Sequence, residues 1–163
     1  MPVPDSVVNA SAPVEEAETL PGDIRAAAMD LLARREHSVQ ELRAKLKRRF
    51  ADESMIDEQL ARLARDNLQS DERFAGSYVR QRVGRGYGPL RLRAELRERG
   101  VSDADSDIAL EVAAVDWCEL ASTVLRKKYG DGEPRDMKDK ARRIRFMQHR
   151  GFATDHYRGL LWE

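Results

Sequence analysis

The amino-acid sequence predicts an all-α protein: a tandem array of three three-helix repeats behind a disordered acidic N-terminal tail. Apolar residues recur every three to four positions along most of the chain, as on the buried face of a helix. Alternating patterns and β-branched runs typical of strands are weak throughout. Similar segments also return after about fifty residues, which is typical of helical repeat proteins. The expected boundaries are a tail at 1–22 and repeats at 23–68, 69–114 and 115–163.

The repeat is clearest in the segments that carry its apolar anchors. ELRAKLKRRF at 41–50 matches RLRAELRERG at an offset of 50 residues, which places Leu42 on Leu92. Further along the chain, RFMQHRGF places Met147 on Leu96 at an offset of 51 residues. We therefore expect equivalent buried anchors in successive repeats, namely Leu42, Leu92 and Met147 or its neighbour Ile144.

In the first repeat, Asp23 can cap a helix over 24–35. Ser38, with Glu41 three residues later, has the pattern of a capping box and predicts the start of a second helix. Ser54 signals the third start. The apolar stripes expected to pack together are Ile24, Ala28, Leu31 and Leu32, then Leu42, Leu46 and Phe50, then Ile56, Leu60 and Leu63, with Asn67 continuing the third helix.

The second repeat contains a helix, a glycine-marked corner at 84–88 and a second helix. Pro89 suits the first turn of that second helix, where its missing N–H is no loss. Gly100 lies where a left-handed C-cap is expected, and Ser102-Asp103 can cap the third helix. The expected anchors are Phe74, Ala75, Tyr78, Val79 and Val83, then Leu90, Leu92 and Leu96, then Ile108, Val112 and Val115.

The third repeat begins with a helix that ends at Tyr129-Gly130, followed by a turn at 131–134. A strongly basic helix follows, and 152–162 is long enough for one short terminal helix. The expected stripes are Trp117, Ala121, Val124 and Leu125, then Met137, Ala141, Ile144 and Met147.

The formal net charge is zero, but the charge is unevenly distributed. Residues 1–23 hold five of the 29 acidic residues and no Lys or Arg, so residues 24–163 carry 29 basic and 24 acidic side chains. Between Arg80 and Arg99, seven arginines stand against Glu95 and Glu98. On a single helix such charges indicate a solvated face. In a repeat array, equivalent positions line up, and a basic stripe would attract phosphates or an acidic protein groove.

The sequence gives no support for catalysis, and we expect no enzyme, metal site or cofactor. The three histidines have no metal-ligand spacing: His37, His149 and His156. The corner at 84–88 follows a helix and lacks the lysine and hydroxyl of a phosphate-binding loop. Cys118 is the single cysteine, which excludes an internal disulfide and a thiolate metal cluster.

No apolar run approaches the roughly 20 residues that a membrane span requires. The N-terminus also lacks the basic and then apolar pattern of a secretory signal. The expected location is therefore the cytoplasm, without contact to a membrane.

Three segments resemble the RecX family of bacterial recombination regulators. They are LLARREHSVQELRAKL at 31–46, FAGSYVRQRVGRGYGPLRLRAELRERGV at 74–101 and RFMQHRGF at 145–152. The resemblance covers about 24–163, and its first two motifs are the more specific. The acidic tail lies outside it.

The resemblance implies a fold of three tandem three-helix repeats that form an elongated, curved helical array. It also implies binding to RecA recombinase filaments on DNA, restraint of their ATPase and strand-exchange activities, and a part in recombination, DNA repair and the SOS response. Family members have no catalytic residues. The implied contact residues are basic ones on the curved face, drawn from Arg80, Arg82, Arg85, Arg91, Arg93, Arg97, Arg142, Arg143 and Arg145.

Two alternatives remain open from the sequence. One is an autonomous helical module that binds single- or double-stranded DNA by itself. The other is a helical scaffold whose charges serve only solvation. The expected state is a monomer.

Overall fold

The computed structural model describes residues 18–162, so most of the predicted acidic tail lies outside the described residues. Within this range the chain forms helices and no strand, which confirms the predicted all-α class. None of these helices is long and apolar enough to cross a membrane. The helices are α1 (Pro21–Arg34), α2 (Val39–Lys47), α3 (Glu53–Arg65), α4 (Asp71–Gly84), α5 (Pro89–Glu98), α6 (Asp103–Ala113), α7 (Trp117–Tyr129), α8 (Met137–Arg150) and α9 (Thr154–Leu161).

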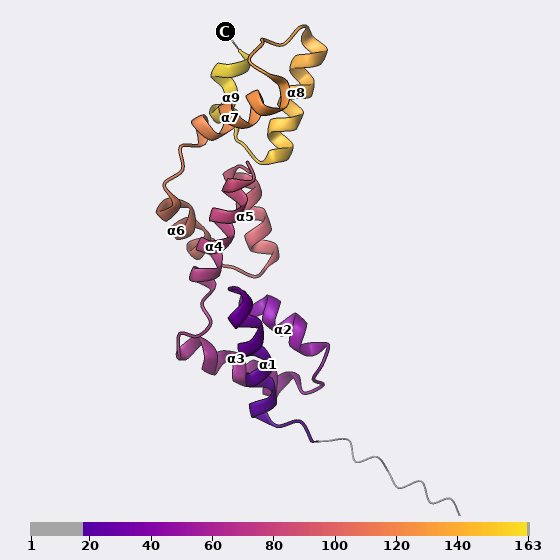
Figure 1. Ribbon diagram of the computed structural model, residues 1–163, viewed down its shortest axis with the longest axis vertical. Coiled ribbons are helices and arrows are strands. Elements are labelled where there is room, and N and C mark those ends of the chain that lie inside the picture. The colour runs from indigo at the N-terminus through magenta and orange to yellow at the C-terminus, as the bar shows by residue number, and fades with distance from the viewer. Residues whose placement is uncertain (1–17, 163) are drawn as a thin grey trace, which may run out of the picture.

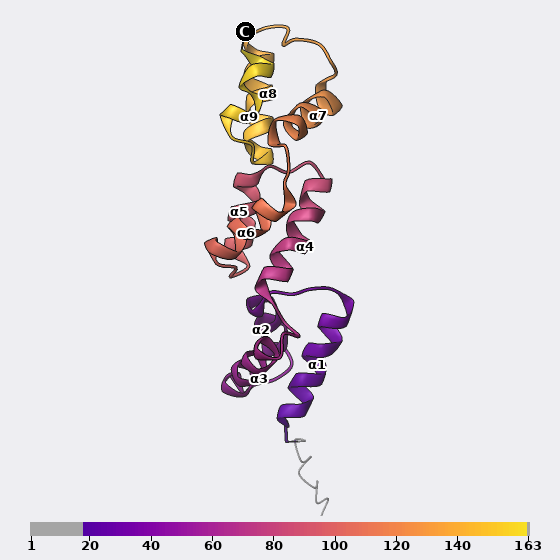
Figure 2. The same ribbon diagram turned by 90° about the vertical axis from the view of Figure 1, so that its left-hand side faces the viewer.

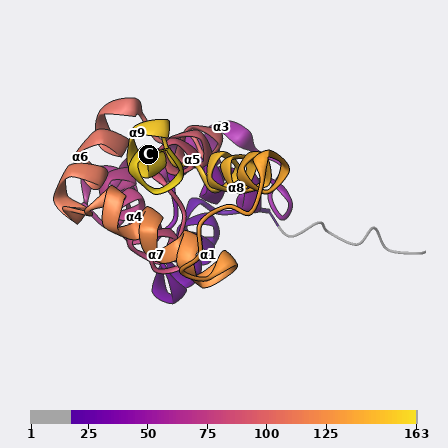
Figure 3. The same ribbon diagram turned by 90° about the horizontal axis from the view of Figure 1, so that it is seen from above.

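The helices group into three successive units that stack along the long axis of the molecule (Figure 1). In each unit the first helix packs on the third: α1 on α3, α4 on α6, and α7 on α9. Figure 2 shows α1, α4 and α7 along one side of the stack, with the other two helices of each unit beside them. From above, the three units lie over one another (Figure 3). This is the three-unit array that the sequence predicts, and its elongated shape is the one that the resemblance implies.

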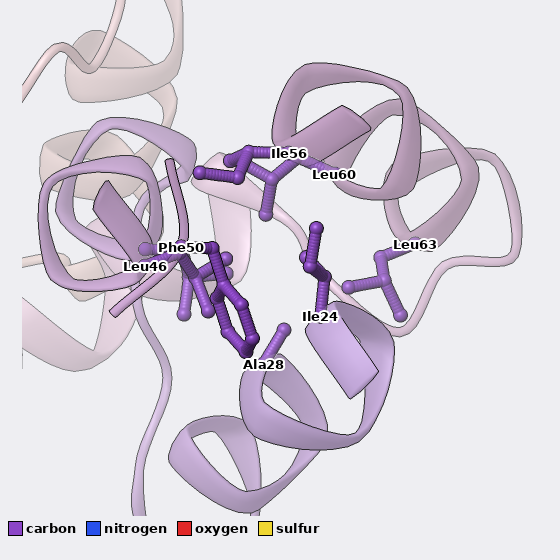
Figure 4. Close-up of a cluster of buried hydrophobic side chains, with 8 residues drawn as sticks. Ile24, Ala28, Leu46, Phe50, Ile56, Leu60 and Leu63 are labelled. Atoms are coloured by element: carbon purple, nitrogen blue, oxygen red, sulfur yellow. The ribbon is translucent and has the colours of Figure 1, made fainter. Parts of the chain in front are cut away.

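Each unit has its own hydrophobic core. In the first unit, Ile24 and Ala28 of α1 meet Leu46 of α2 and Ile56 and Leu60 of α3 (Figure 4). Because each unit buries its apolar side chains internally, a chain with 36% charged residues can fold around three small cores. The second core contains Phe74, Ala75, Val79, Leu92, Leu96, Val101, Ala109 and Leu110, and the third contains Ala121, Val124, Leu125, Met147, Phe152, Tyr157 and Leu161.

Most helices begin at a side-chain cap. At six of the described helices a Ser or Asp side chain accepts a hydrogen bond from the backbone N–H three residues later, which satisfies a donor that the helix leaves unpaired. These caps are Ser38, Asp52, Ser70, Ser102, Asp116 and Asp136.

Two predicted helix starts were wrong. The first helix begins at Pro21 rather than after Asp23, whose carboxylate lies inside the first turn and accepts from the Leu20 N–H at 3.0 Å. Ser54 lies inside α3, because Asp52 caps that helix two residues earlier.

Only half of the predicted capping box at Ser38 is found among the described contacts. The Ser38 hydroxyl accepts from the Glu41 N–H at 3.1 Å. The Glu41 carboxylate, however, pairs with Arg35 at 3.0 Å. Asn67 also departs from the prediction, since α3 ends at Arg65 and Asn67 takes a left-handed φ of 56°.

The third helix of the second unit, α6, turns a different face inward than its apolar pattern predicts. Ile108 and Val112 are 42% and 75% exposed, whereas Ala109 is buried. The reason is the close packing of α6 on α4, where Ala109 and Ala75 leave room for the two helices to approach. Two other expected anchors are also exposed, namely Leu90 and Met137.

The third unit follows the repeat with one substitution at a core position. Met147 corresponds to Leu96, and both side chains are fully buried. The carbonyl of each residue accepts a hydrogen bond at 3.1 Å from the backbone N–H five residues later, directly after the glycine that ends the helix. In this alignment Arg143, four residues before Met147, is equivalent to Leu92, four residues before Leu96. The expectation that Met147 or Ile144 would be the equivalent of Leu92 is therefore wrong.

The middle helices α8 and α5 meet end to end. The Gly88 N–H donates to the Arg150 carbonyl at 2.8 Å, and the Leu90 N–H donates to the Gly151 carbonyl at 3.0 Å. A Cβ added at Gly88 would overlap the Gly151 carbonyl, and one added at Gly151 would overlap Arg91. Gly151 also has a φ of 89°. Glycine is required at these two positions because two backbones approach directly.

The same contact recurs between α5 and α2. The Ser38 hydroxyl donates to the Arg99 carbonyl at 2.8 Å, and the Gln40 amide donates to the Glu98 carbonyl at 3.1 Å. Each junction supplies partners for carbonyls that a helix end leaves unpaired. It also brings the negative end of one helix dipole to the positive end of the next. Helices α8, α5 and α2 thus form one head-to-tail column.

Candidate partner-binding surface

Glu95 of α5 is the centre of a side-chain cluster that holds α4, α5 and the glycine corner together. Its carboxylate accepts hydrogen bonds from the Tyr78 hydroxyl at 2.6 Å, from Arg82 Nε at 2.9 Å and from Arg91 Nε at 2.8 Å. The guanidinium groups of Arg82 and Arg91 also lie 4.1 and 4.4 Å from the centroid of the Tyr87 ring. Two of the sequence-predicted contact residues, Arg82 and Arg91, therefore make internal contacts.

The protonation of this Glu95 cluster follows from burial and hydrogen bonding. Burial by itself raises the pKa of Glu95, but the hydrogen bonds from Arg82, Tyr78 and Arg91 outweigh it and lower the pKa to about 2. Burial, together with the hydrogen bond to Glu95, raises the pKa of Tyr78 to about 12. Glu95 is therefore ionised and Tyr78 neutral across the physiological range.

Arg93 and Arg97 lie on the outer face of α5 and are 44% and 69% exposed. Each pairs with a carboxylate of α6: Arg93 with Asp107, and Arg97 with Asp103 at 2.9 Å. A partner can reach both arginines, but their charges are partly neutralised within the unit.

Arg143, also a predicted contact residue, is buried, and the prediction that it faces a partner is wrong. Its side chain is 7% exposed and pairs with Asp139 at 3.1 Å. It donates to the carbonyls of Gly132 at 2.7 Å and Glu133 at 3.3 Å. The backbone N–H of Arg135 and the Arg143 guanidinium hold the pKa of Asp139 below its usual value. Arg143 therefore ties the loop between α7 and α8 to α8 itself.

The remaining predicted contact residues are exposed arginines that form no ion pair within residues 18–162. Two belong to the second unit, at the end of α4 and in the corner after it, and two belong to α8. They are Arg80, Arg85, Arg142 and Arg145. Of the nine predicted residues, these four carry the charge that is most available to a partner.

An open groove lies where the glycine corner meets α7 and α8, and we call it the junction groove. Its volume is about 350 Å³, and its four cationic residues are Arg85, Lys127, Lys128 and Arg150. Lys127, Lys128 and Arg150 were not predicted from the sequence as site residues. The helical spacing of Leu120, Val124 and the two lysines could have indicated that α7 presents an apolar stripe with a basic end.

The other candidate chemistry of the sequence has structural explanations. Within residues 18–162, no group of His, Cys, Asp and Glu is placed to hold a metal ion. His37 is buried between the Arg35 carbonyl at 3.0 Å and Lys45 Nζ at 2.9 Å. His156 packs against Trp117, and Cys118 is exposed.

Among the described residues, three stacked three-helix units are joined end to end and carry exposed cations without ion pairs, which defines a helical-repeat protein with a basic surface. The chain belongs to the RecX family: the family models of the first, second and third RecX three-helix domains match residues 25–63, 70–110 and 115–158. The resemblance noted in the sequence is thereby confirmed.

Curated relatives extend over most of the chain. The regulatory protein RecX of Pseudomonas putida is 44% identical over 135 residues, which cover 83% of this chain and 86% of the relative. That of Halorhodospira halophila is 43% identical over 145 residues, covering 89% and 90%. These relatives are named as regulatory proteins.

Two solved structures share the fold. A crystal structure of regulatory protein RecX superimposes with a TM-score of 0.74 at 24% identity, covering 85% of this chain and 71% of that one. RecX from Lactobacillus salivarius gives 0.66 at 23% identity, covering 83% and 90%. At these identities the structures support the fold alone.

Proposed function

We propose that this chain is a non-enzymatic regulator that binds RecA recombinase filaments on DNA and restrains their ATPase and strand-exchange activities. The observation that carries the proposal is the match of all three units to the RecX family, whose relatives are named regulatory proteins. A regulator of this kind acts by binding, and its shape and charge are the properties that matter.

The distribution of unpaired charge supports a contact made by the second and third units. Arg80 lies near the end of α4 and Arg85 lies in the corner directly after that helix. Arg142 and Arg145 lie about one turn apart on α8. Arginine suits both carboxylates and phosphates because its guanidinium can bind either in a bidentate manner. Arg93 and Arg97 contribute less in this proposal, since a partner must compete with their carboxylates on α6.

The proposal is tested by RecA-catalysed ATP hydrolysis on single-stranded DNA, measured against increasing amounts of the chain. Replacing Arg142 and Arg145 by Glu should raise the concentration needed for half-inhibition by roughly tenfold or more, because two interface charges are reversed. Inhibition by the unchanged chain should also weaken as salt rises.

The matched control is the double variant Arg34→Glu with Arg65→Glu. Both arginines are exposed, belong to the first unit and form no ion pair within the described residues, so the change in net charge is the same. Equal inhibition by the two folded variants would contradict a contact at α8. Absence of any inhibition by the unchanged chain would contradict the proposed function itself.

Binding to bare DNA separates the proposal from the autonomous nucleic-acid module. If the α8 variant loses inhibition while any binding to a free oligonucleotide is unchanged, the contact is to the filament protein. If inhibition requires enough chain to cover the DNA, and both activities fall together, the alternative is correct.

A further inference from the structure

The junction groove brings together three segments that are far apart in the sequence. Gly86, with a φ of 80°, allows the corner after α4 to approach α7 so closely that an added Cβ would lie 2.8 Å from Val124. Arg150 closes the other side: its guanidinium donates to the Arg85 carbonyl at 2.9 Å and lies 4.8 Å from the centroid of Tyr87. The shape of the groove is therefore held by contacts within the chain.

The groove is lined by positive charge without a carboxylate. Arg85, Lys127 and Lys128 are exposed and form no ion pair among the described residues, and Arg150 is held in place beside them. A larger hollow of about 430 Å³, between the start of α8 and α9, is lined by Glu133 and Asp136 as well as a lysine. Carboxylates outnumber the lysine there, whereas the positive charge of the junction groove is uncompensated, so the junction groove attracts an anionic ligand.

The floor of the groove is aliphatic. It is formed by Val83 beside the corner and by Leu120 and Val124 of α7. The single aromatic side chain, Phe146, already packs edge-to-face on Tyr129, with ring centroids 5.6 Å apart, and lies under the Arg150 guanidinium at 5.4 Å. Phe146 is therefore already in contact with two neighbours, and no other aromatic side chain lines the groove on which a nucleobase could stack.

The basic lining and the aliphatic floor together distinguish between two anionic ligands that could bind in the groove, a single-stranded nucleic acid and an acidic peptide. Sites for single-stranded nucleic acid combine a basic channel with aromatic stacking platforms. An aliphatic floor beneath a ring of cations instead suits a peptide whose carboxylates meet the cations while one apolar side chain is buried. The charge complementarity and the floor therefore favour a peptide.

We propose that the junction groove is a docking site for an acidic peptide segment of a partner protein, which inserts one apolar side chain over Leu120 and Val124. Lys127, Lys128 and Arg85 bind its carboxylates, and Arg150 supplies a fixed positive charge at the groove wall. The inference goes beyond the proposed function, because it concerns the chemistry of the ligand and not the identity of the protein that carries it.

The test is direct binding, by fluorescence anisotropy, of a labelled synthetic peptide of aspartates and glutamates around a central leucine. The full chain should bind this peptide, and replacing the leucine by serine should weaken binding by roughly tenfold, as expected for one buried aliphatic side chain. Lys127→Ala with Lys128→Ala should weaken it by a similar factor. Equal affinity for the leucine and serine peptides would overturn the proposal.

Two further variants keep the result specific to the groove. Arg34→Ala with Arg65→Ala removes the same charge from the first unit and should leave peptide binding unchanged. Thr123→Trp fills the groove from an exposed position without removing a charge, and it should reduce binding as much as the lysine variant does. Unaltered binding by Thr123→Trp would overturn the proposal.

A labelled oligodeoxythymidylate tests the other ligand class. The lysine variant should affect the peptide more than the oligonucleotide. A groove that binds the oligonucleotide in preference to the leucine peptide, and loses it in Thr123→Trp, would overturn the assignment to a peptide. No RecA is present in these measurements, so their outcome is independent of the inhibition assay.

Discussion

At the residue scale, the arginines of this chain differ in whether a carboxylate lies within reach. Arg82 and Arg91 share Glu95, and Arg143 is buried on Asp139. These arginines stabilise the units, whereas those without a carboxylate remain available to a partner. The local excess of positive charge in the sequence therefore overstates the charge that a partner meets.

Replacing Glu95 by Gln tests the role of the Glu95 cluster in stability. The pKa of Glu95 is about 2 in the folded chain against an ordinary value of 4.5. Because the folded pKa is depressed, the stabilisation is fully present above pH 4.5 and is lost as the pH falls toward 2. Its size is about 3 kcal/mol, so urea unfolding at pH 7 should show a loss of that order in Glu95→Gln.

The pH dependence is the control for this prediction. The difference in unfolding free energy between the unchanged chain and Glu95→Gln should shrink steadily between pH 4.5 and 2, as Glu95 becomes protonated in both states. A difference that is the same at pH 7 and near pH 2 would show that the carboxylate charge is not its source.

At the element scale, helix ends determine how the units join. The contact between α8 and α5 requires glycine at position 88, although the φ of Gly88 is −87° and suits any residue. The requirement is therefore steric and arises from the approach of a helix in the next unit.

Gly88→Ala should accordingly lower stability without affecting the backbone conformation of its own helix start. The added methyl group meets the backbone at Gly151, and forcing extra volume into a close contact costs about 1–3 kcal/mol. Thermal melting should detect the loss. Gly84→Ala is the matched control, because nothing lies within 4 Å of a Cβ there. If both variants melt at the same temperature, the end-to-end contact contributes nothing to stability.

At the scale of the whole molecule, three separate cores should make the effect of a core substitution local. Leu92→Ala removes a fully buried side chain from the second core and should cost about 2–5 kcal/mol. Hydrogen exchange should accelerate most in α4, α5 and α6, because nearest neighbours in a repeat array are coupled only through their junctions. An equal acceleration in all three units would show that the array unfolds as a single cooperative core.

The helices could be predicted from the sequence because their periodicity and caps are local signals. Ser38 and Ser102 cap helices as expected, and a glycine at 100 ends α5 with a left-handed φ of 77°. The face that each helix buries depends on its neighbours. Ile108 and Val112 point outward because α6 packs on α4 through smaller residues, which no pattern within α6 reveals.

The candidate site was predicted at the level of helices and less well at the level of side chains. The basic helices α5 and α8 were identified, but the pairing of Arg91 with Glu95 and the burial of Arg143 depend on contacts across the fold. The junction groove was not predicted, because its walls come from three segments that only the stacking of units brings together. Lys127 and Lys128 are inconspicuous in the sequence for that reason.

The head-to-tail column has a consequence for assembly between molecules. A contact that joins the end of one helix to the start of the next is not closed by symmetry, and between separate copies it would propagate into an open fibre. At one free end of the column, the N–H of Asp139 is taken by Asp136, whose carboxylate would repel the carbonyls of an incoming helix end. At the other free end, Phe50 stands where Gly100 and its counterpart stand in the later units, and it is buried in the first core. The two free ends therefore differ from the helix ends that meet at the internal junctions, which disfavours the addition of a second copy to the column.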